Sequence, residues 1–285
     1  MQAARARARP VGGGGWLWVA PAVVLFGALY TVPLARIFYL SVADPELSLQ
    51  HYRYLVGEPV YLRVLGVTFE VGLMVTAACL VIGYPVACLL ASLRGRSLQI
   101  ALVFILLPFW TSVLVRNWAW IALLARTGLV NTLLVKLGLI DAPLPLMFNR
   151  TGVVIGMTYV LLPFMILALY AVMHGIEPEY LRASASLGAS RLQTFWRVFF
   201  PLSLPGVWAG GLLVFIMAIG FFITPALLGG GRVPMVATLI ESQIRGVLNW
   251  GLGAALACVL LAIVLALLFV FDRFLGLEHL FGGSR

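Results

Sequence analysis

The stretch that decides the fold is HGIEPEYLRASASLGASRLQTFWRVFFPLSLPG, residues 174–206, the one long polar interruption in a largely apolar chain. Pro178 suits the first position of a helix, where its missing N–H is no loss. Glu177 and Glu179 place negative charge at the positive end of that helix dipole. No breaker follows until Gly188, where a helix C-cap favours a residue that adopts φ > 0. These signals predict a short helix of roughly 15 Å, about half of what a bilayer core requires.

A second helix is predicted directly after this one. Ser190 and Gln193 form a capping-box pair at its start, and the arginines and aromatic rings that follow suit a membrane interface. We expect Pro201 and Pro205 to end this helix and turn the chain into the next apolar span. The residues alone allow two interpretations. The pair is either an ordinary interfacial connection between two spans or a docking element presented to a soluble partner.

The composition indicates an integral membrane protein. Of 285 residues, 62% are hydrophobic, and they are spread along the whole chain, which excludes a single anchor on a soluble domain. A net charge of +9 would suggest nucleic acid as the partner of a soluble protein. Here arginines that flank membrane spans and face anionic lipid explain it, so we expect membrane lipid, and no nucleic acid, as a partner.

The apolar runs predict an all-α fold with six transmembrane helices. The expected spans are 16–35, 64–93, 100–124, 151–173, 204–228 and 250–271. The first run follows basic residues, as a signal peptide does, but it is too long for one and no Ala-x-Ala site follows it. We therefore interpret it as a retained span.

Four segments follow from this reading. They are a basic cytoplasmic tail over 1–15, a first span with an external loop over 16–63, the main transmembrane domain over 64–272, and a cytoplasmic tail over 273–285. An even number of spans places both termini on the same side of the membrane as residues 174–206. Arg94 and Arg96, in the short turn after the second span, lie on that side too.

The 174–206 segment resembles the cytoplasmic signature of permease subunits of bacterial binding-protein-dependent ABC importers. That signature reads Glu-Ala-Ala, three residues, Gly, nine residues, Ile, one residue, Leu-Pro. The corresponding positions here, in order, are Arg182-Ala183-Ser184, Gly188, Val198 and Phe200-Pro201. The spacing, the Gly and the Pro are kept, whereas Arg182 replaces the usual Glu and puts the polar contact made there in doubt.

The resemblance extends over about residues 64–272 and points to the spermidine/putrescine branch of the family. The stretches that carry it are PFWTS at 108–112, Arg116, GLIDAP at 138–143, LLPFM at 161–165 and LGASRLQTF at 187–195. It implies the type I importer fold, with a coupling helix that sits in a cleft of the ATPase subunit. The residues expected to couple to the ATPase are Glu179, Arg182, Ala183, Ser184, Gly188 and Pro201.

The resemblance also implies partners and a location. Two permeases, similar but usually not identical, pair with two ATP-binding subunits and an external solute-binding protein in the bacterial inner membrane. ATP and Mg²⁺ are expected on the ATPase subunits and no cofactor on this chain, which has no phosphate loop and only one lysine, Lys136. The solute implied is a polyamine or related amine, with opines, amino-acid-like and other small organic solutes as alternatives.

Ionisable groups within or near spans are the candidates for the solute path, because they are costly in a bilayer. Glu70 and Glu241 suit a cationic amine. The other candidates are Tyr84, Trp110, Arg116, Asn117 and Trp118, whose aromatic members could add cation–π contacts. The alternative for each is snorkelling or pairing, for example Glu70 with Arg63 or Arg116.

Two other classes remain open on the residues alone. A self-contained secondary transporter would show ion-coupling groups and often internal repeats, and no convincing repeat is visible. An enzyme embedded in the membrane would need a catalytic constellation, and none is visible. The three cysteines and three histidines form no metal-ligand spacing, so no metal site is predicted.

Overall fold

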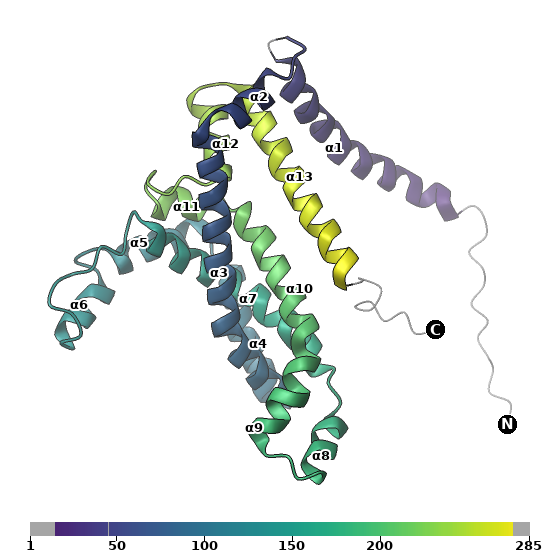
Figure 1. Cartoon of the computed structure of the whole chain (residues 1–285), viewed down its shortest axis with the longest axis vertical. Coiled ribbons are helices and arrows are strands. Elements are labelled where there is room, and N and C mark those ends of the chain that lie inside the picture. The colour runs from purple at the N-terminus through teal and green to yellow at the C-terminus, as the bar shows by residue number, and fades with distance from the viewer. Residues whose placement is uncertain (1–14, 45, 276–285) are drawn as a thin grey trace.

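The computed structural model describes residues 15–44 and 46–275, and regular structure within these ranges is helical throughout (Figure 1). The helices before the signature segment are α1 Gly15–Ala43, α2 Gln50–Gly57, α3 Pro59–Ser92, α4 Gly95–Leu106, α5 Val113–Leu124, α6 Leu129–Lys136 and α7 Arg150–His174. Those from that segment onward are α8 Pro178–Ser186, α9 Arg191–Thr194, α10 Phe200–Ile219, α11 Ile223–Leu228, α12 Val236–Glu241 and α13 Trp250–Leu275.

The core of the molecule lies between α3, α7 and α10, and the two most extensive contacts between helices are those of α7 with α3 and with α10. Each contributes a stripe of fully buried apolar side chains, such as Val75 on α3, Leu161 on α7 and Val214 on α10. Small residues let α7 and α10 approach closely. A Cβ added at Gly210 would lie 2.9 Å from the Met165 sulfur and 3.2 Å from the Ala168 Cβ, so a larger residue would force these side chains to shift.

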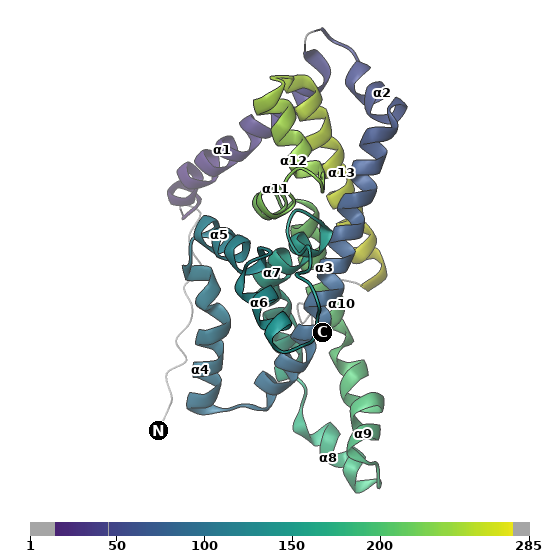
Figure 2. The ribbon, with the colours of Figure 1, turned by 90° about the vertical axis from the view of Figure 1, so that its left-hand side faces the viewer.

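The helices α1, α2, α12 and α13 form a second group at one end of α3 (Figures 1 and 2). A small core of Leu55, Leu252, Ala255 and Leu256 joins α2 to α13. The Tyr52 hydroxyl donates to Ser41 Oγ at 2.9 Å, which ties α2 to the end of α1, and burial raises the pKa of this tyrosine. The remainder of α1 packs chiefly along α13 and leaves most of its apolar side chains exposed.

Six segments of the described chain are long and apolar enough to cross a membrane. They are 19–43, 59–92, 113–136, 150–174, 191–219 and 250–273, with a shorter apolar segment at 95–110. The number of spans predicted is therefore confirmed by length and composition. The predicted cytoplasmic tails lie outside the described residues, except for Gly15 and the last residues of α13.

The third span predicted over 100–124 is wrong as one continuous helix. Helix α4 ends at Leu106, a 3₁₀ turn covers 107–110, and α5 begins only at Val113 after extended backbone at Thr111. Pro108 cannot donate a helix hydrogen bond, which favours a break at this point. Figure 2 shows that α4 and α5 run in different directions on either side of this break.

The fifth predicted span, 204–228, also differs from the structure. Helix α10 ends at Ile219, and the chain breaks at Gly220 before the separate short helix α11. Pro201 and Pro205 do not end the preceding helix as predicted, since both lie within α10. A π turn over Phe195–Phe199, in which the Phe200 N–H bonds to the Phe195 carbonyl, leads into α10. Pro201 lies in the first turn of α10, where a missing N–H is tolerated, and Pro205 lies inside the helix.

Candidate functional site

Helix α8 begins where the sequence predicts. Pro178 occupies the first helical position, Glu177 is the N-cap with extended backbone, and Glu179 lies in the first turn. The helix runs nine residues to Ser186 and contains no buried residue. It lies with α9 at the end of the molecule farthest from α2 and α12 (Figure 1). The helix is thus short and exposed along its length, with two negative charges at its N-terminal end.

The end of α8 depends on Gly188. Its φ is +83°, and its N–H bonds to the Ala185 carbonyl at 3.0 Å. The next N–H, of Ala189, bonds to the Ser184 carbonyl at 3.2 Å, which completes a Schellman cap. A Cβ at Gly188 would meet no atom within 4 Å, so the glycine is required by its backbone conformation and not by lack of space.

Helix α9 is held against α8 by polar contacts. The predicted capping box is confirmed, because Ser190 Oγ accepts from the Gln193 N–H and Gln193 Oε1 accepts from the Ser190 N–H. Between the two helices, the Ser184 and Thr194 hydroxyls lie 3.0 Å apart. The pair therefore forms a closed hairpin with a fixed connection.

The surface of this hairpin is apolar enough to favour a partner. Leu187, at the tip, is 89% exposed, and Tyr180 and Leu192 are exposed beside it. A shallow hollow between α8 and the π turn includes Ala183, one of the predicted coupling residues. Exposed apolar side chains clustered on a polar element are typical of a protein contact.

Arg182, which departs from the family signature, pairs within its own helix. Its guanidinium lies 3.6 Å from Glu179, and both side chains are more than half exposed. A pair this exposed contributes only about 0–1 kcal/mol to stability. The charge of Arg182 is thus partly balanced by Glu179, while its guanidinium stays accessible on the surface of the hairpin.

The hairpin is connected rigidly to the membrane helices. The π turn and Pro201 lead from α9 into α10 without a break in helical structure. The Tyr84 hydroxyl on α3 lies 2.7 Å from Ser203 Oγ on α10, and the Tyr84 ring packs on Phe195 and Phe200. Tyr84, predicted as a path residue, is therefore placed as a contact between helices above the hairpin.

Glu70 forms an ion pair with Arg150 at the start of α7, and neither side chain is fully buried. Glu70 is therefore paired, as the alternative from the sequence allowed, but its partner is Arg150 and not Arg63 or Arg116, which the sequence suggested as examples. The packing of α3 along α7 brings Arg150 to Glu70 instead, although 80 residues separate them in the chain. No local pattern could have identified this partner.

Arg116 stabilises the break between α4 and α5. Its guanidinium donates to the carbonyl oxygens of Pro108 and Thr111, the latter at 2.9 Å, and lies 5.7 Å from the centre of the Tyr159 ring. Asn117 is 1% exposed, and its amide donates to the Val113 carbonyl at 2.8 Å. Both predicted path residues are therefore engaged within the chain.

The remaining path candidates lie on three different elements. Trp110 is 88% exposed beside the break and Trp118 is exposed on α5, whereas Glu241 lies at the end of α12 and is partly buried. Among the described residues, no group of His, Cys, Asp and Glu is placed to hold a metal ion. Of the predicted path residues, Glu70 forms an ion pair, and its partner Arg150 was not among the predicted path residues.

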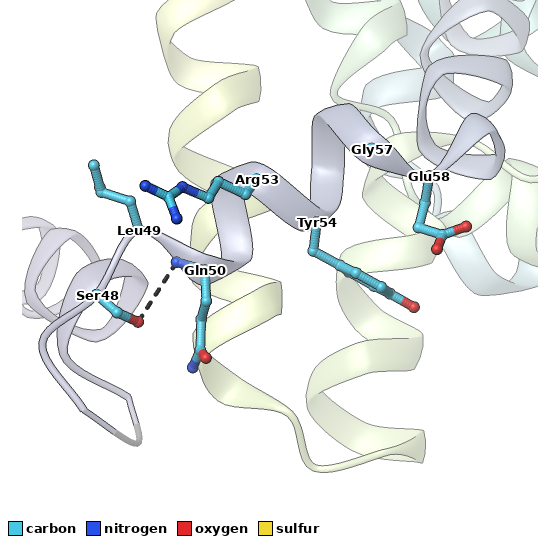
Figure 3. Close-up of a pocket in the computed structure, with 7 residues that line it drawn as sticks. All are labelled: Ser48, Leu49, Gln50, Arg53, Tyr54, Gly57 and Glu58. Atoms are coloured by element: carbon cyan, nitrogen blue, oxygen red, sulfur yellow. Dashed lines mark hydrogen bonds between the residues drawn. The ribbon is translucent and has the colours of Figure 1, made fainter.

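An open hollow lies around α2, at the opposite end of the molecule from α8. Figure 3 shows that Arg53 and Glu58 point away from each other there, with Tyr54 between them. The Gln50 N–H and Ser48 Oγ are 3.5 Å apart, which holds the turn into the helix. The two charged side chains of this hollow therefore do not point to a common position.

Comparison with known proteins supplies the family. Residues 80–275 match the family model described as binding-protein-dependent transport system inner membrane component. The spermidine/putrescine transport system permease protein PotB of Escherichia coli (strain K12) is 36% identical over 264 residues, covering 91% of this chain and 94% of that protein. The inner membrane ABC transporter permease protein YdcU of the same organism is 33% identical over 283 residues, covering 92% and 88%.

A solved structure of similar fold comes from a bacterial ABC transporter that imports the acidic polysaccharide alginate. Its matching chain has a TM-score of 0.65 and 18% sequence identity, and the match covers 91% of this chain and 96% of that one. At this identity the likeness concerns the fold alone. The all-helical type I importer fold expected from the sequence is confirmed.

Proposed function

This chain belongs to the family of inner membrane components of binding-protein-dependent transport systems, and from that premise we propose that it is the permease subunit of an ATP-driven polyamine importer. The observation that carries the choice of solute is the likeness to the E. coli spermidine/putrescine permease over nearly the whole chain. Opines and other small organic solutes are the alternatives that the test below must separate.

The α8–α9 hairpin is the element proposed to receive the ATPase subunit. It is short, exposed and apolar at Leu187, and its shape is fixed by the Gly188 cap and the bond from Ser184 to Thr194. ATP and Mg²⁺ belong in this proposal to two copies of a separate ATPase subunit. The hairpin then carries motion of the ATPase into α10 and, through Tyr84 and Ser203, into α3.

The other partners are a second, non-identical permease and an external solute-binding protein. Long exposed apolar faces, such as those of α1 and α4, fit contact with lipid or with the second permease. The hairpin then faces the cytoplasm and, with six spans, both termini do as well. This orientation places the α2 end of the molecule outside the inner membrane.

The solute path is proposed to include Glu70 and Glu241. A protonated amine can exchange with the Arg150 guanidinium on Glu70, because that ion pair is partly exposed and therefore weak. Trp110 and Trp118 are exposed and could offer ring faces to the cation. Tyr84, Arg116 and Asn117 support the helices around the path.

The test is uptake by the complete complex. The chain is purified from native membranes in mild detergent with its partners, reconstituted in liposomes, and supplied with ATP inside and binding protein outside. We expect uptake of labelled spermidine that depends on both ATP and the binding protein. Uptake by this chain alone without ATP would contradict the importer and reopen the class of secondary transporters, whereas ATP-dependent uptake of another solute alone would overturn the polyamine assignment.

A further inference from the structure

A partly enclosed hollow of about 320 Å³ lies where α5 ends and α7 begins. Its lining is mostly apolar and includes Ile121, Leu124, Leu146 and Phe148. Leu124 is only 2% exposed, so the lining reaches into the packed core. Two arginines, Arg126 and Arg232, complete it from the end of α5 and from the chain after α11.

The hollow and the α8–α9 hairpin lie on opposite sides of the membrane. Helix α7 is a single membrane-spanning segment, from Arg150 to His174. The hollow is lined by residues just before its first turn, whereas α8 begins four residues after its last. If α8 meets the ATPase in the cytoplasm, the hollow faces the outside, where the solute-binding protein acts.

The walls of the hollow are already fixed in place. The Phe148 N–H donates to the Leu228 carbonyl at 2.9 Å, with Phe148 in the left-handed region at φ +57°. Its ring fills the space above Gly230, where an added Cβ would lie 2.3 Å from a ring carbon. The two connecting loops are thus joined to each other, and a partner would not have to order them on binding.

The two arginines carry positive charge that the chain itself does not neutralise. Over the part of the chain that the structure describes, neither Arg126 nor Arg232 forms an ion pair or a side-chain hydrogen bond, and both are exposed. Arg150, two residues after Phe148, differs because Glu70 neutralises it. Two free guanidinium groups therefore border an apolar hollow on the outward side.

We propose that this hollow is a docking site for an acidic segment of the external solute-binding protein, an inference that rests on the proposed function. Carboxylates of that segment accept hydrogen bonds from Arg126 and Arg232, and an apolar side chain beside them inserts against Leu124. A site for a small oxyanion would instead offer buried polar donors, which this lining lacks. A polyamine is itself a cation, so the same arginines repel free solute and favour solute delivered by the protein.

The experiment uses the reconstituted permease–ATPase complex in nanodiscs, with solute-loaded binding protein titrated to stimulate ATP hydrolysis. In the R126Q/R232Q variant we expect the half-saturating concentration of binding protein to rise about tenfold, with the maximal rate unchanged. Each single variant takes an intermediate value. The matched control is Lys136→Gln, which removes an exposed cation on α6 away from the hollow and leaves the titration unchanged.

A salt series on the wild-type complex gives a measurement without any variant. The half-saturating concentration should rise with ionic strength and do so less steeply in R126Q/R232Q. An unchanged titration in the double variant, or no salt dependence in the wild type, overturns the docking site alone. An altered solute KM with intact binding-protein affinity places the arginines in the solute path and also overturns it. A wild-type complex that no binding protein stimulates contradicts the proposed function, and this inference with it.

Discussion

The Ser184 hydroxyl on α8 lies 3.0 Å from the Thr194 hydroxyl on α9, and this hydrogen bond joins the two arms of the hairpin. If α8 transmits force from an ATPase to α10, the bond keeps the two arms moving together. A neutral hydrogen bond of this kind contributes about 0.5–1.5 kcal/mol. Its loss would therefore loosen the hairpin without unfolding the protein.

We expect Ser184→Ala to reduce ATP-driven uptake about threefold to tenfold while the amount of complex in the membrane stays the same, since a bond of about 1 kcal/mol is lost. Thr194→Val should have a similar effect, and the double variant should be no worse than either. Uptake and ATP hydrolysis measured on all four members of this cycle test the bond. Fully additive effects would show that the two hydroxyls act independently.

Gly188→Ala should weaken coupling through the backbone. Placing a residue with a Cβ at φ +83° destabilises the backbone by about 1–2 kcal/mol. An added Cβ would meet no atom within 4 Å, so contacts with neighbours do not change this energy. Gly188→Asn is the matched variant, because asparagine tolerates this conformation better than alanine does. We expect uptake to decrease in the order glycine, asparagine, alanine. Equal uptake by the alanine variant and the wild type would argue against a role for the cap.

Variants of Glu70 and Arg150 can show whether Glu70 acts by pairing with Arg150 or by contacting the solute. If Glu70 binds the amine, Glu70→Gln raises the KM for uptake about tenfold, whereas Arg150→Gln does not raise it. In the reversed pair E70R/R150E the ion pair is restored, but we expect the KM for uptake to stay raised, because position 70 then carries a positive charge. If both Glu70→Gln and Glu241→Gln leave the uptake kinetics unchanged, neither residue belongs to the path.

Arg116→Lys tests the break between α4 and α5. Lysine cannot donate to the Pro108 and Thr111 carbonyls in the forked geometry of a guanidinium, so about 1.5–3 kcal/mol of hydrogen bonding to a charged group is at stake. We expect a lower Tm of the purified complex. Arg182→Lys, which alters an exposed pair, is the control and should leave the Tm unchanged.

Local signals were sufficient to predict the hairpin. The start of α8 at Pro178, its cap at Gly188 and the box at Ser190 all depend on residues within a few positions of each other. Such patterns are read directly from sequence because helix ends are satisfied by neighbouring groups. The six apolar segments were predictable for a similar reason, since length and hydrophobicity alone set a span.

The errors arose where side-chain contacts and helix packing, and not hydrophobicity, decide the outcome. Hydrophobicity is continuous through residues 100–124, so it could not show that the Arg116 guanidinium satisfies carbonyls at a break beside Pro108. The partner of Glu70 depends on how α3 and α7 cross, which no pattern within either helix specifies. The two arginines of the proposed docking hollow, Arg126 and Arg232, are 106 residues apart in the chain and line the same hollow only in the fold.

The π turn over Phe195–Phe199 sets the direction in which the hairpin faces relative to α10. A π turn is an α-helical turn with one residue inserted. Removing one residue restores α-helical spacing and rotates α8 and α9 by about 100° around the helix axis. The hairpin would then present a different face to its partner.

Deleting Val198 is the direct test of this arrangement. We expect at least a tenfold loss of ATP-driven uptake, with the ATPase subunit released from the purified complex while the permease stays in the membrane. Val198→Ala keeps the number of residues and should keep most of the uptake, so it separates the spacing from the side chain. If the deletion variant retained both the ATPase subunit and uptake, the direction of the hairpin would not matter for coupling. The contacts of Tyr84 with Phe195 and Ser203 would then be sufficient to carry the motion into the membrane.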